Sequence, residues 1–480
     1  MKTLPIKQQL MVFLLGMLMA SCSITKPYQR PDITTNGLYR GHQTTDSTTL
    51  ATVPWRQMFA DSVLQHLIER GLANNLDLKI AVARMQAAEA NLQQSKLAFF
   101  PTLSTNGAFT ISKSSSAQLR SLNIKNTESG SNTVSTTAIP TVKQYALTAS
   151  TSWEADVWGK LRSTKRANLA AYLQSEAYRR AVQTQLIANI ASDYYALLAY
   201  DKQLQITEET VENRKTEIET MKALKEGDVV TGADVAQSEA NRYAAEVTLP
   251  DIRQNIRQTE NALSILLATP PDSIARTRLE AQQPIGSLQT GIPAQLLGNR
   301  PDVQEAEFSF RNTFELTNVA RTYFYPALTI TGTGGFATAN TLTGFFAGTF
   351  YGSLISGLTQ PIFNQGINRQ RLNRAEAAQS EAFYTYQSTL LTAGQEVSNA
   401  LYSYQMAVDK ANARQQQLAA LQKAVSFTKE LLTYTANTNF TDVLTAEQNL
   451  LAAQLNGVND RLQQLQATVA LYRALGGGWR

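Results

Sequence analysis

Residue types that could carry out chemistry are scarce in this sequence. Its 480 residues include one cysteine, Cys22, and two histidines, His42 and His66. A zinc site of the usual Cys/His type cannot be assembled from that stock, and a Ser-His-Asp triad would need one of two histidines that lie near the start of the chain. The nearest approach to a nucleotide-binding glycine loop, residues 332–335, lies in a strand-like pattern and opens no helix. We therefore expect no enzyme, no cofactor and no metal site.

Cys22 stands where bacterial lipoproteins are acylated. Two lysines precede an apolar stretch over 10–20, which is too short to span a bilayer and leads into the run LMASC. This pattern predicts a signal peptide over 1–21, cleavage before Cys22, and acyl chains on its thiol and amine that tether the protein to a membrane. Ser23 does not resemble an inner-membrane retention signal, so we expect the outer membrane. The alternative is an ordinary signal peptide with a chance cysteine.

Charge and hydropathy exclude other classes of protein. The formal charge of +5 falls to +3 when Lys2 and Lys7 leave with the signal peptide, and no dense Lys/Arg cluster offers a face for nucleic acid. No other stretch of 18 apolar residues occurs, so the sequence predicts no transmembrane helix.

The sequence after residue 76 contains an internal duplication. Pro101 and Pro326 each follow aromatic residues and precede an alternating stretch. The first half predicts a helix, two strands and two long helices at 77–99, 102–112, 145–157, 160–226 and 231–268. The second half predicts the same order at 302–325, 327–336, 351–363, 366–436 and 441–475. The domains that follow are a signal peptide (1–21), an acylated N-terminal segment with an equatorial part (22–76), the first repeat (77–268), an equatorial linker (269–301), the second repeat (302–475) and a tail (476–480).

The first three predicted strands alternate between one apolar and one polar face, and the fourth, with Leu354, Leu358 and several glycines, shows the pattern more weakly. In hydrocarbon every backbone polar group must be paired, so a sheet must close on itself, and roughly eight strands make the smallest closed barrel. One chain supplies only four, which predicts an obligate oligomer. Glu154 and Asp156 lie on the polar face and are expected to line the mouth of a pore. An aromatic girdle is expected near the strand ends, from Phe99, Phe100, Trp153, Trp158, Tyr323 and Tyr325. The alternative is an amphipathic sheet that covers a soluble core.

The long helices carry coiled-coil seams. From Leu444 to Tyr472, positions spaced alternately four and three residues apart are mostly apolar, which is the heptad pattern of a coiled coil. Pro250 and Gly457 are expected to interrupt the two returning helices at one level. An equatorial belt is expected there, built from 30–60, 269–300 and the C-terminal tail.

The mature chain resembles the TolC-like outer membrane factor family, in its lipoprotein branch associated with efflux pumps of the RND type. The motifs are LLGNRPDVQEAE (296–307), SWEADVWGKLR (152–162), LTQPIFNQGINRQ (358–370) and LYRALGGGW (471–479). The resemblance implies a mainly α fold with a transmembrane β part: a homotrimer with a 12-stranded β-barrel, continued by a 12-helix α-helical barrel. It also implies that the protein crosses the periplasm and docks to a periplasmic adaptor protein and an inner-membrane pump.

The resemblance places the functional residues at two helix-hairpin tips, 224–235 and 432–444. Adaptor contacts fall on Gly227, Val230, Gly232, Ala233, Asn437, Thr438, Asn439 and Phe440. The periplasmic aperture falls on Asp234, Thr441, Asp442 and Thr445. Many members carry aspartate where Thr445 stands, as part of an acidic ring, which Asp442 would supply in this chain. Asp234 and Asp442 also fit the third position after a helix N-cap, which leaves capping open beside gating.

We therefore expect a passive outer membrane exit duct for drugs or other small molecules. The alternatives are a type I protein-secretion or metal-efflux duct on the same fold, and a periplasmic coiled-coil lipoprotein without a pore. We also expect Gly232→Pro combined with Phe440→Asp to abolish export while trimers remain. The exported substrate, the cognate pump and adaptor, and the residues that close the aperture cannot be inferred from the sequence.

Overall fold

The computed structural model describes residues 24–35, 37–40, 49–113, 115, 141–283, 293–434 and 440–480. Cys22, Asn437, Thr438 and Asn439 lie outside the described residues. The chain forms two compact units, one built mainly from 89–170 and 311–380 and the other mainly from 30–88, 171–310 and 381–480.

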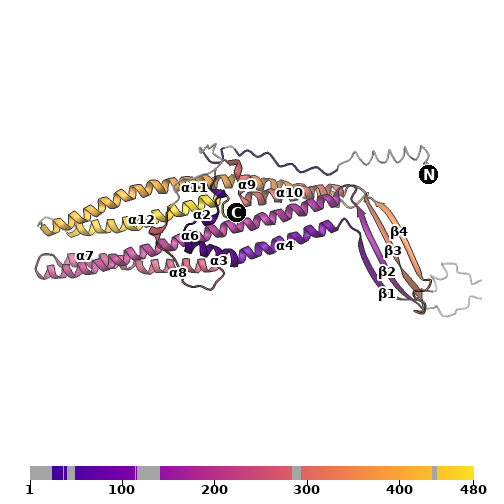
Figure 1. Ribbon diagram of the computed structural model, residues 1–480, viewed down its shortest axis with the longest axis horizontal. Helices are drawn as coiled ribbons and strands as arrows, with labels where there is room; N and C mark the ends of the chain where they lie inside the picture. The colour runs from indigo at the N-terminus through magenta and orange to yellow at the C-terminus, as the bar shows by residue number, and fades with distance from the viewer. Residues whose placement is uncertain are drawn as a thin grey trace, which may run out of the picture. The chain divides into compact units, whose positions relative to one another are not determined.

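The first unit contains a single four-stranded antiparallel sheet (Figure 1). Its strands, β1 (Thr102–Lys113), β2 (Thr141–Ala155), β3 (Ala327–Ala339) and β4 (Phe350–Thr359), lie in the order β1-β2-β3-β4. The pairing of β2 with β3 joins the two sequence repeats, with Leu147 opposite Phe336. The order leaves β1 and β4 at the two edges, each with one described neighbour.

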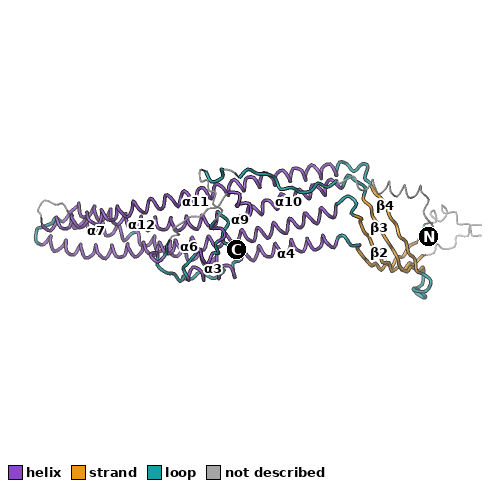
Figure 2. The backbone as a smooth tube through the Cα atoms, turned by 45° about the horizontal axis from the view of Figure 1, so that its top comes forward, coloured by secondary structure: helices purple, strands orange, loops and turns teal. Residues whose placement is uncertain are grey.

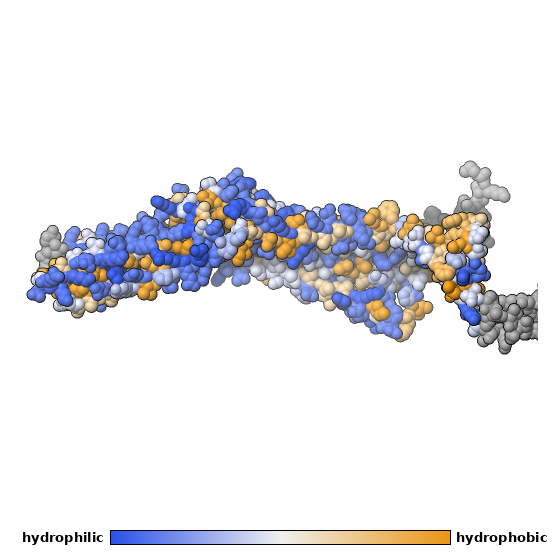
Figure 3. Space-filling view, turned by 90° about the horizontal axis from the view of Figure 1, so that it is seen from below, coloured by the Kyte–Doolittle hydropathy of each residue, from blue (hydrophilic) through white to orange (hydrophobic). Residues whose placement is uncertain are grey.

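The apolar face of this sheet is exposed on the single chain. The side chains of Leu103, Phe109 and Leu354 are 77%, 56% and 78% exposed, and apolar residues gather over the strands in Figure 3. A sheet that covered a soluble core would bury these side chains. The described part of the chain therefore does not fit the alternative of a soluble amphipathic sheet.

Aromatic residues close the connections between strands and helices. The indole Nε1 of Trp153 donates to the carbonyl of Phe99 at 2.9 Å, and that of Trp158 donates to the carbonyl of Pro326 at 2.6 Å. The rings of Trp158 and Tyr325 lie 5.3 Å apart. The expected cluster of aromatic residues is therefore present where the strands meet the helices.

A helix of 22 residues precedes each pair of strands and a much longer helix follows it: α4 (Leu76–Leu97) and α6 (Lys160–Glu226) in the first repeat, α10 (Pro301–Thr322) and α11 (Ile367–Tyr434) in the second. The bounds predicted for 160–226 are confirmed residue for residue. Gly159 and Gly366 precede α6 and α11 with φ of +80° and +79°. Only glycine takes this conformation without strain, so the two repeats turn from strand to helix in the same way.

Each of the two longest helices is followed by a returning partner (Figure 2). The first return is split into α7 (Gly232–Glu246) and α8 (Thr248–Leu266), whereas α12 (Phe440–Ala474) is continuous. Pro250 lies in the first turn of α8 and would clash with the carbonyl of Glu246, so the break falls one turn earlier than expected. The expected interruption at Gly457 is wrong, because this glycine lies against Arg414 and Leu418 of α11 within an unbroken helix.

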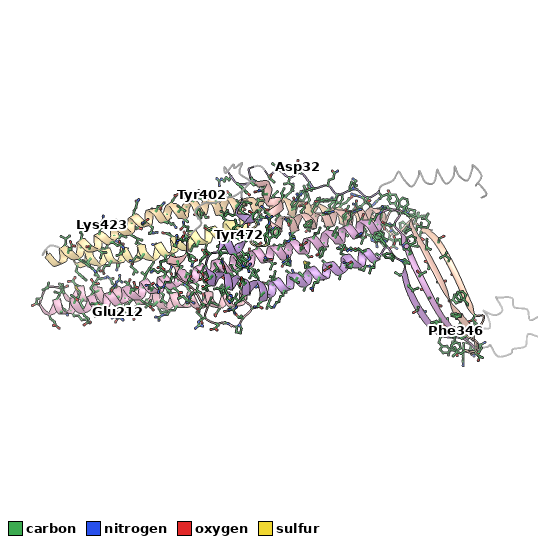
Figure 4. All side chains as sticks on the ribbon, viewed as in Figure 1. Asp32, Glu212, Phe346, Tyr402, Lys423 and Tyr472 are labelled. Carbon is green, nitrogen blue, oxygen red and sulfur yellow. The ribbon has the colours of Figure 1, made fainter. Side chains whose placement is uncertain are left out.

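The main hydrophobic core of the second unit contains residues from the segments predicted to form the equatorial belt. Short elements pack there against the long helices: α2 (Trp55–Met58), α3 (Ser62–Asn74), α9 (Leu296–Asn299) and the 3₁₀ turns Leu50–Thr52, Leu279–Ala281 and Pro293–Gln295. Tyr472 of α12, labelled in Figure 4, is buried there and donates its hydroxyl to the carbonyl of Val53 at 2.6 Å. The predicted belt segments therefore meet in one core.

Two polar clamps hold this belt. The carboxylate of Asp61 caps α3 and accepts hydrogen bonds from Tyr194 and Thr277 at 2.8 and 2.5 Å. Arg300, in the LLGNRPD motif, is buried and donates to Glu396 of α11 at 2.6 Å and to the carbonyl of Ala474 at 3.0 Å. A half-buried carboxylate such as that of Asp61 needs hydrogen-bond donors, and a buried guanidinium such as that of Arg300 needs an anion beside it.

Replacing Gly335 by alanine is expected to weaken the β2–β3 pairing. Its Cβ would lie 2.3 Å from the carbonyl oxygen of Leu147 and 2.9 Å from the Cα of Thr148, and backbone atoms cannot move aside without breaking the ladder. Overpacking of this kind costs about 1–3 kcal/mol, which a lower melting temperature of the purified protein would report. Gly107→Ala in β1 is the matched control, since nothing lies within 4 Å of its added Cβ. Equal melting temperatures for the two variants would contradict the close approach.

Candidate functional site

The first hairpin tip is a tight turn between α6 and α7. The amide of Val229 donates to the carbonyl of Leu224 at 2.9 Å, and the amide of Asp228 donates to that of Lys225 at 3.0 Å. This pattern is a Schellman motif, and its left-handed position is taken by Asp228 with φ +56°. Gly227 is therefore not the residue that supplies the positive φ of this turn.

Thr231 and Asp234 form a capping box at the start of α7. The amide of Asp234 donates to the Thr231 hydroxyl at 3.3 Å, and the Asp234 carboxylate accepts from the amide and hydroxyl of Thr231 at 2.8 and 2.7 Å. These hydrogen bonds, from the Thr231 side chain first, lower the pKa of Asp234. The capping interpretation of Asp234 is confirmed, and its part in an aperture remains a proposal.

The second tip is described from Phe440 onward. Asp442 and Thr445 are exposed on the first turns of α12, and the hydroxyl of Thr445 donates to the carbonyl of Thr441 at 2.8 Å. The cap expected from Asn439 lies outside the described residues. These contacts are local to α12. The assignment of Thr441, Asp442 and Thr445 to the aperture therefore stays a prediction.

A small apolar cluster joins the two tips. It contains four buried side chains, Met221, Val235, Phe440 and Leu444, with Leu224 and Val230 packed against it. Phe440 is only 5% exposed. This burial does not fit its assignment to the adaptor contacts, because a side chain inside the tip is not available to a partner, and we assign Phe440 to supporting the tip.

One exposed apolar residue at the tip was not singled out from the sequence. Val229 is 68% exposed, while Val230 beside it is half-buried. The pair of valines in a short turn was the available signal, because such a turn can bury only one of two successive side chains.

Polar contacts also cross between the hairpins. The side-chain amide of Gln448 on α12 donates to the Asn241 side chain on α7 at 2.7 Å, and that of Gln203 on α6 donates to Asn459 at 2.8 Å. A groove of about 1210 Å³ runs between the hairpins near the tips. It is lined by part of the apolar cluster, including Met221 and Phe440, by charged groups on all four helices and by small polar side chains.

Each hairpin carries the same internal ion pair. Lys222 of α6 lies 3.6 Å from Glu239 of α7, and Lys429 of α11 lies 2.5 Å from Glu447 of α12. The lysines are 207 positions apart and the glutamates 208, which matches the spacing of the sequence repeat. Glu447 also lines the groove together with Glu217 of the other hairpin and raises the pKa of Glu217. Sequence reasoning missed this pair, because residue 217 has no acidic counterpart in the second repeat.

Glu154 and Asp156 have local partners near the start of α6. Glu154 accepts from Lys160 at 3.0 Å, and Asp156 accepts from the backbone amides of Leu161 and Arg162 at 2.9 and 3.1 Å. Asp156 lies beyond the end of β2 and not on its polar face, so that part of the expectation is wrong. A place for either residue at the pore mouth remains a prediction.

The described residues contain no helix that is long and apolar enough to cross a membrane. They also contain no group of three His, Cys, Asp or Glu side chains that could hold a metal ion.

Known proteins resemble this chain over nearly its whole length. The sequence pattern of the family described as "Outer membrane efflux protein" matches residues 67–269 and 292–477. The toluene efflux pump outer membrane protein TtgC of Pseudomonas putida is 30% identical over 482 residues, covering 98% of this chain and 96% of that protein. The cation efflux system protein CusC of Escherichia coli is 29% identical, covering 98% and 99%. The structure of the open MtrE outer membrane channel of Neisseria gonorrhoeae matches with a TM-score of 0.82 at 25% identity, covering 96% and 99%.

A proline in place of Gly232 alone is expected to be tolerated by the fold of the first tip. Gly232 is the first residue of α7, where proline fits, and Thr231 before it already has the extended backbone that a following proline requires. We expect Gly232→Pro to leave the stability of the tip unchanged or to raise it by up to about 0.4–1 kcal/mol. Gln237→Pro, inside the same helix, is the matched control and costs about 3 kcal/mol. The rate of limited proteolysis at the tip reports the stability of both variants. Rapid cleavage of Gly232→Pro would show that residue 232 is not the first residue of the helix.

Proposed function

This chain belongs to the outer membrane efflux protein family, and from that premise we propose how it forms a duct. It is the outer membrane component of an efflux system and not an enzyme. We propose that three copies form one cylinder, with four strands from each copy closing a β-barrel and the long helices continuing it into the periplasm. The duct is passive, and an inner-membrane pump, joined through a periplasmic adaptor, supplies the energy.

The observation that carries this proposal is the open sheet. β1 and β4 each have one described neighbour, and the apolar face of the sheet is exposed. Unpaired backbone groups in hydrocarbon cost several kcal/mol each, so such a sheet is stable in a membrane only when its edges are joined to other copies. Helices of 67 and 68 residues, at about 1.5 Å per residue, are far longer than a globular core needs and suit the wall of a tube.

We propose that the cargo consists of small organic molecules. Two relatives at 30% identity are a toluene efflux pump outer membrane protein and an antibiotic efflux pump outer membrane protein. Four of the eight methionines lie in the signal peptide, at 1, 11, 17 and 19, so the mature chain keeps four methionines and two histidines. Soft metal cations bind through thioether, thiolate and imidazole groups, and this supply is small. Metal efflux remains the second candidate, because the cation efflux protein CusC is 29% identical.

We propose that the exposed parts of the tips meet the adaptor. Gly227, Gly232 and Ala233 are exposed there together with Val229, whereas Phe440 supports them from inside. The turn is fixed by backbone hydrogen bonds and the capping box, so it presents a defined surface. Asn437, Thr438 and Asn439 complete the proposed contact from the second tip.

Expression of the gene in a Gram-negative strain that lacks its own outer membrane efflux component tests the cargo. We expect resistance to toluene and to hydrophobic antibiotics to return when the cognate adaptor and pump are supplied, and resistance to copper and silver salts to stay unchanged. Metal resistance without drug resistance would favour the second candidate.

Val229→Asp is expected to abolish that resistance while trimers still reach the outer membrane. The change puts a charge on an exposed apolar side chain at the tip, which weakens a contact with a partner but leaves the buried cluster intact. Drug susceptibility and trimer content on unboiled gels are the two measurements. Val247→Asp, at an equally exposed valine between α7 and α8, is the control and is expected to keep resistance.

We also propose that Cys22 carries the lipid anchor. Cys22→Ala is expected to lose incorporation of labelled palmitate while the protein keeps part of its export activity, because the barrel anchors it as well. Mass spectrometry of the mature N-terminus gives a second readout. Palmitate in the alanine variant would rule out this site.

A further inference from the structure

We propose that Glu217 and Glu447 form a proton-controlled clasp between the two hairpins of one chain. In the protonated state the two carboxyl groups share a hydrogen and hold α12 against α6. When that proton leaves, two carboxylates face each other and the clasp is released.

Glu447 lies where α12 contacts the first hairpin, so a change in the charge of the pair acts directly on that contact. Glu447 and its neighbour Gln448 face different helices of the first hairpin, because Glu447 lines the same groove as Glu217 of α6 and Gln448 bonds Asn241 on α7. The first turns of α12 therefore lie in the groove between α6 and α7. The apolar cluster lies just beyond, where Leu444 of α12 packs with Met221 of α6.

The carboxyl groups are partly removed from water. The side chain of Glu447 is 16% exposed and Glu217 is half-buried, and both line the groove near the tips. Two ionised carboxylates in such a place repel each other strongly, so one proton is favoured between them. Burial first, and then the Glu447 charge, raise the pKa of Glu217 to about 7.

Charged groups on the neighbouring helices limit this repulsion without removing it. Lys429 of α11 pairs with Glu447 at 2.5 Å. Arg214, one turn away on α6, is buried, and its guanidinium bonds to the carbonyl of Asn241. On α7, Asp234 also lines the groove, but its charge is held by Thr231. Two cations therefore oppose the two glutamates, and both lower the pKa of Glu217 less than burial and Glu447 raise it.

The direction of the pH effect follows from the raised pKa of Glu217. Its ordinary value is 4.5 and its value in the folded chain is about 7. The stabilising effect of the clasp is therefore fully present below pH 4.5 and is lost as the pH rises through 7. We expect the hairpins to be held together at about pH 5 and to separate more readily at about pH 8.

A distance measurement between the hairpins tests the clasp. Spin labels are placed at Ala223→Cys on α6 and Lys423→Cys on α11, both at exposed positions, in the full-length purified trimer. Electron paramagnetic resonance distances are then recorded from pH 5 to pH 8. We expect a longer or broader distribution at high pH with a midpoint near 7, and no such transition in Glu217→Gln or Glu447→Gln, which keep size and hydrogen bonding but cannot ionise.

Two further variants separate proton control from simple structural support. Lys429→Gln removes a cation that lowers the pKa of Glu217, so its midpoint is expected to move to higher pH. Glu212→Gln, at an exposed glutamate of the same helix labelled in Figure 4, is expected to behave like the unmodified protein. A transition that persists in both glutamine variants at the pair, or unchanged distances between pH 5 and pH 8 in the unmodified protein, would overturn the proposal.

An effect of the clasp on conductance rests in addition on the prediction that the periplasmic aperture, which would be the gate of the duct, lies at these tips. Channel conductance in planar bilayers, measured on the same variants, separates the two ideas. If the distances respond as expected and the conductance does not, the clasp stands and the role of the tips as the gate fails.

Discussion

The architecture depends on the unpaired backbone edges of one small sheet. β1 and β4 each expose a row of N–H and C=O groups, and the apolar face between them is uncovered on the single chain. Water can satisfy those groups and hydrocarbon cannot. A chain with this sheet in a membrane is therefore stable only as part of a closed assembly. Close approaches such as that of Gly335 to the backbone of Leu147 and Thr148 matter for the same reason, because each strand must keep its register for the edges to meet.

Duplication accounts for the regular parts of the fold, and departures from it mark the special ones. Both repeats turn from strand to helix through a glycine in the left-handed region, and both hairpins carry a lysine–glutamate pair at the repeat spacing. The repeats differ at Pro250 and its counterpart Gly457. The chain is split into α7 and α8 near Pro250, whereas α12 continues without a break through Gly457. The repeats differ again at Glu217, which gives one hairpin a carboxyl group that faces the other. The asymmetry lies in the returning helices and at the tips, where the hairpins contact each other.

The sequence predicted features that depend on local periodicity. The bounds of α6 and the order of strands and helices follow from repeated patterns within each element. The segments that pack into one core with the long helices, 30–60 and 269–300, lie before and between the two repeats. The misplaced features depend on contacts between elements. Phe440 is apolar next to a turn, which fits a partner contact as well as a buried support, and only its packing against Met221 and Val235 decides. Asp156 continues the alternation of β2 in sequence, yet the strand ends before it because its carboxylate caps the start of α6. Glu217 and Glu447 are 230 residues apart, and no local pattern brings them together.

The distribution of buried side chains explains why conformational change can be confined to the tips. The belt core packs α3, α6, α11, α12 and the linker segments together and is fixed by Asp61 and Arg300, so separating helices there would expose many apolar side chains and unpaired charges. The tip cluster has four buried side chains, each worth about 1.5–3 kcal/mol when fully buried, and separation of the hairpins exposes each of them only in part. A conformational equilibrium that a partner can shift requires a gap of a few kcal/mol. At the tips the free energy gained or lost with one proton between two glutamates is of the same order as that gap, since one pKa unit corresponds to about 1.4 kcal/mol. In the belt the same proton would change little, because the surrounding core is far larger.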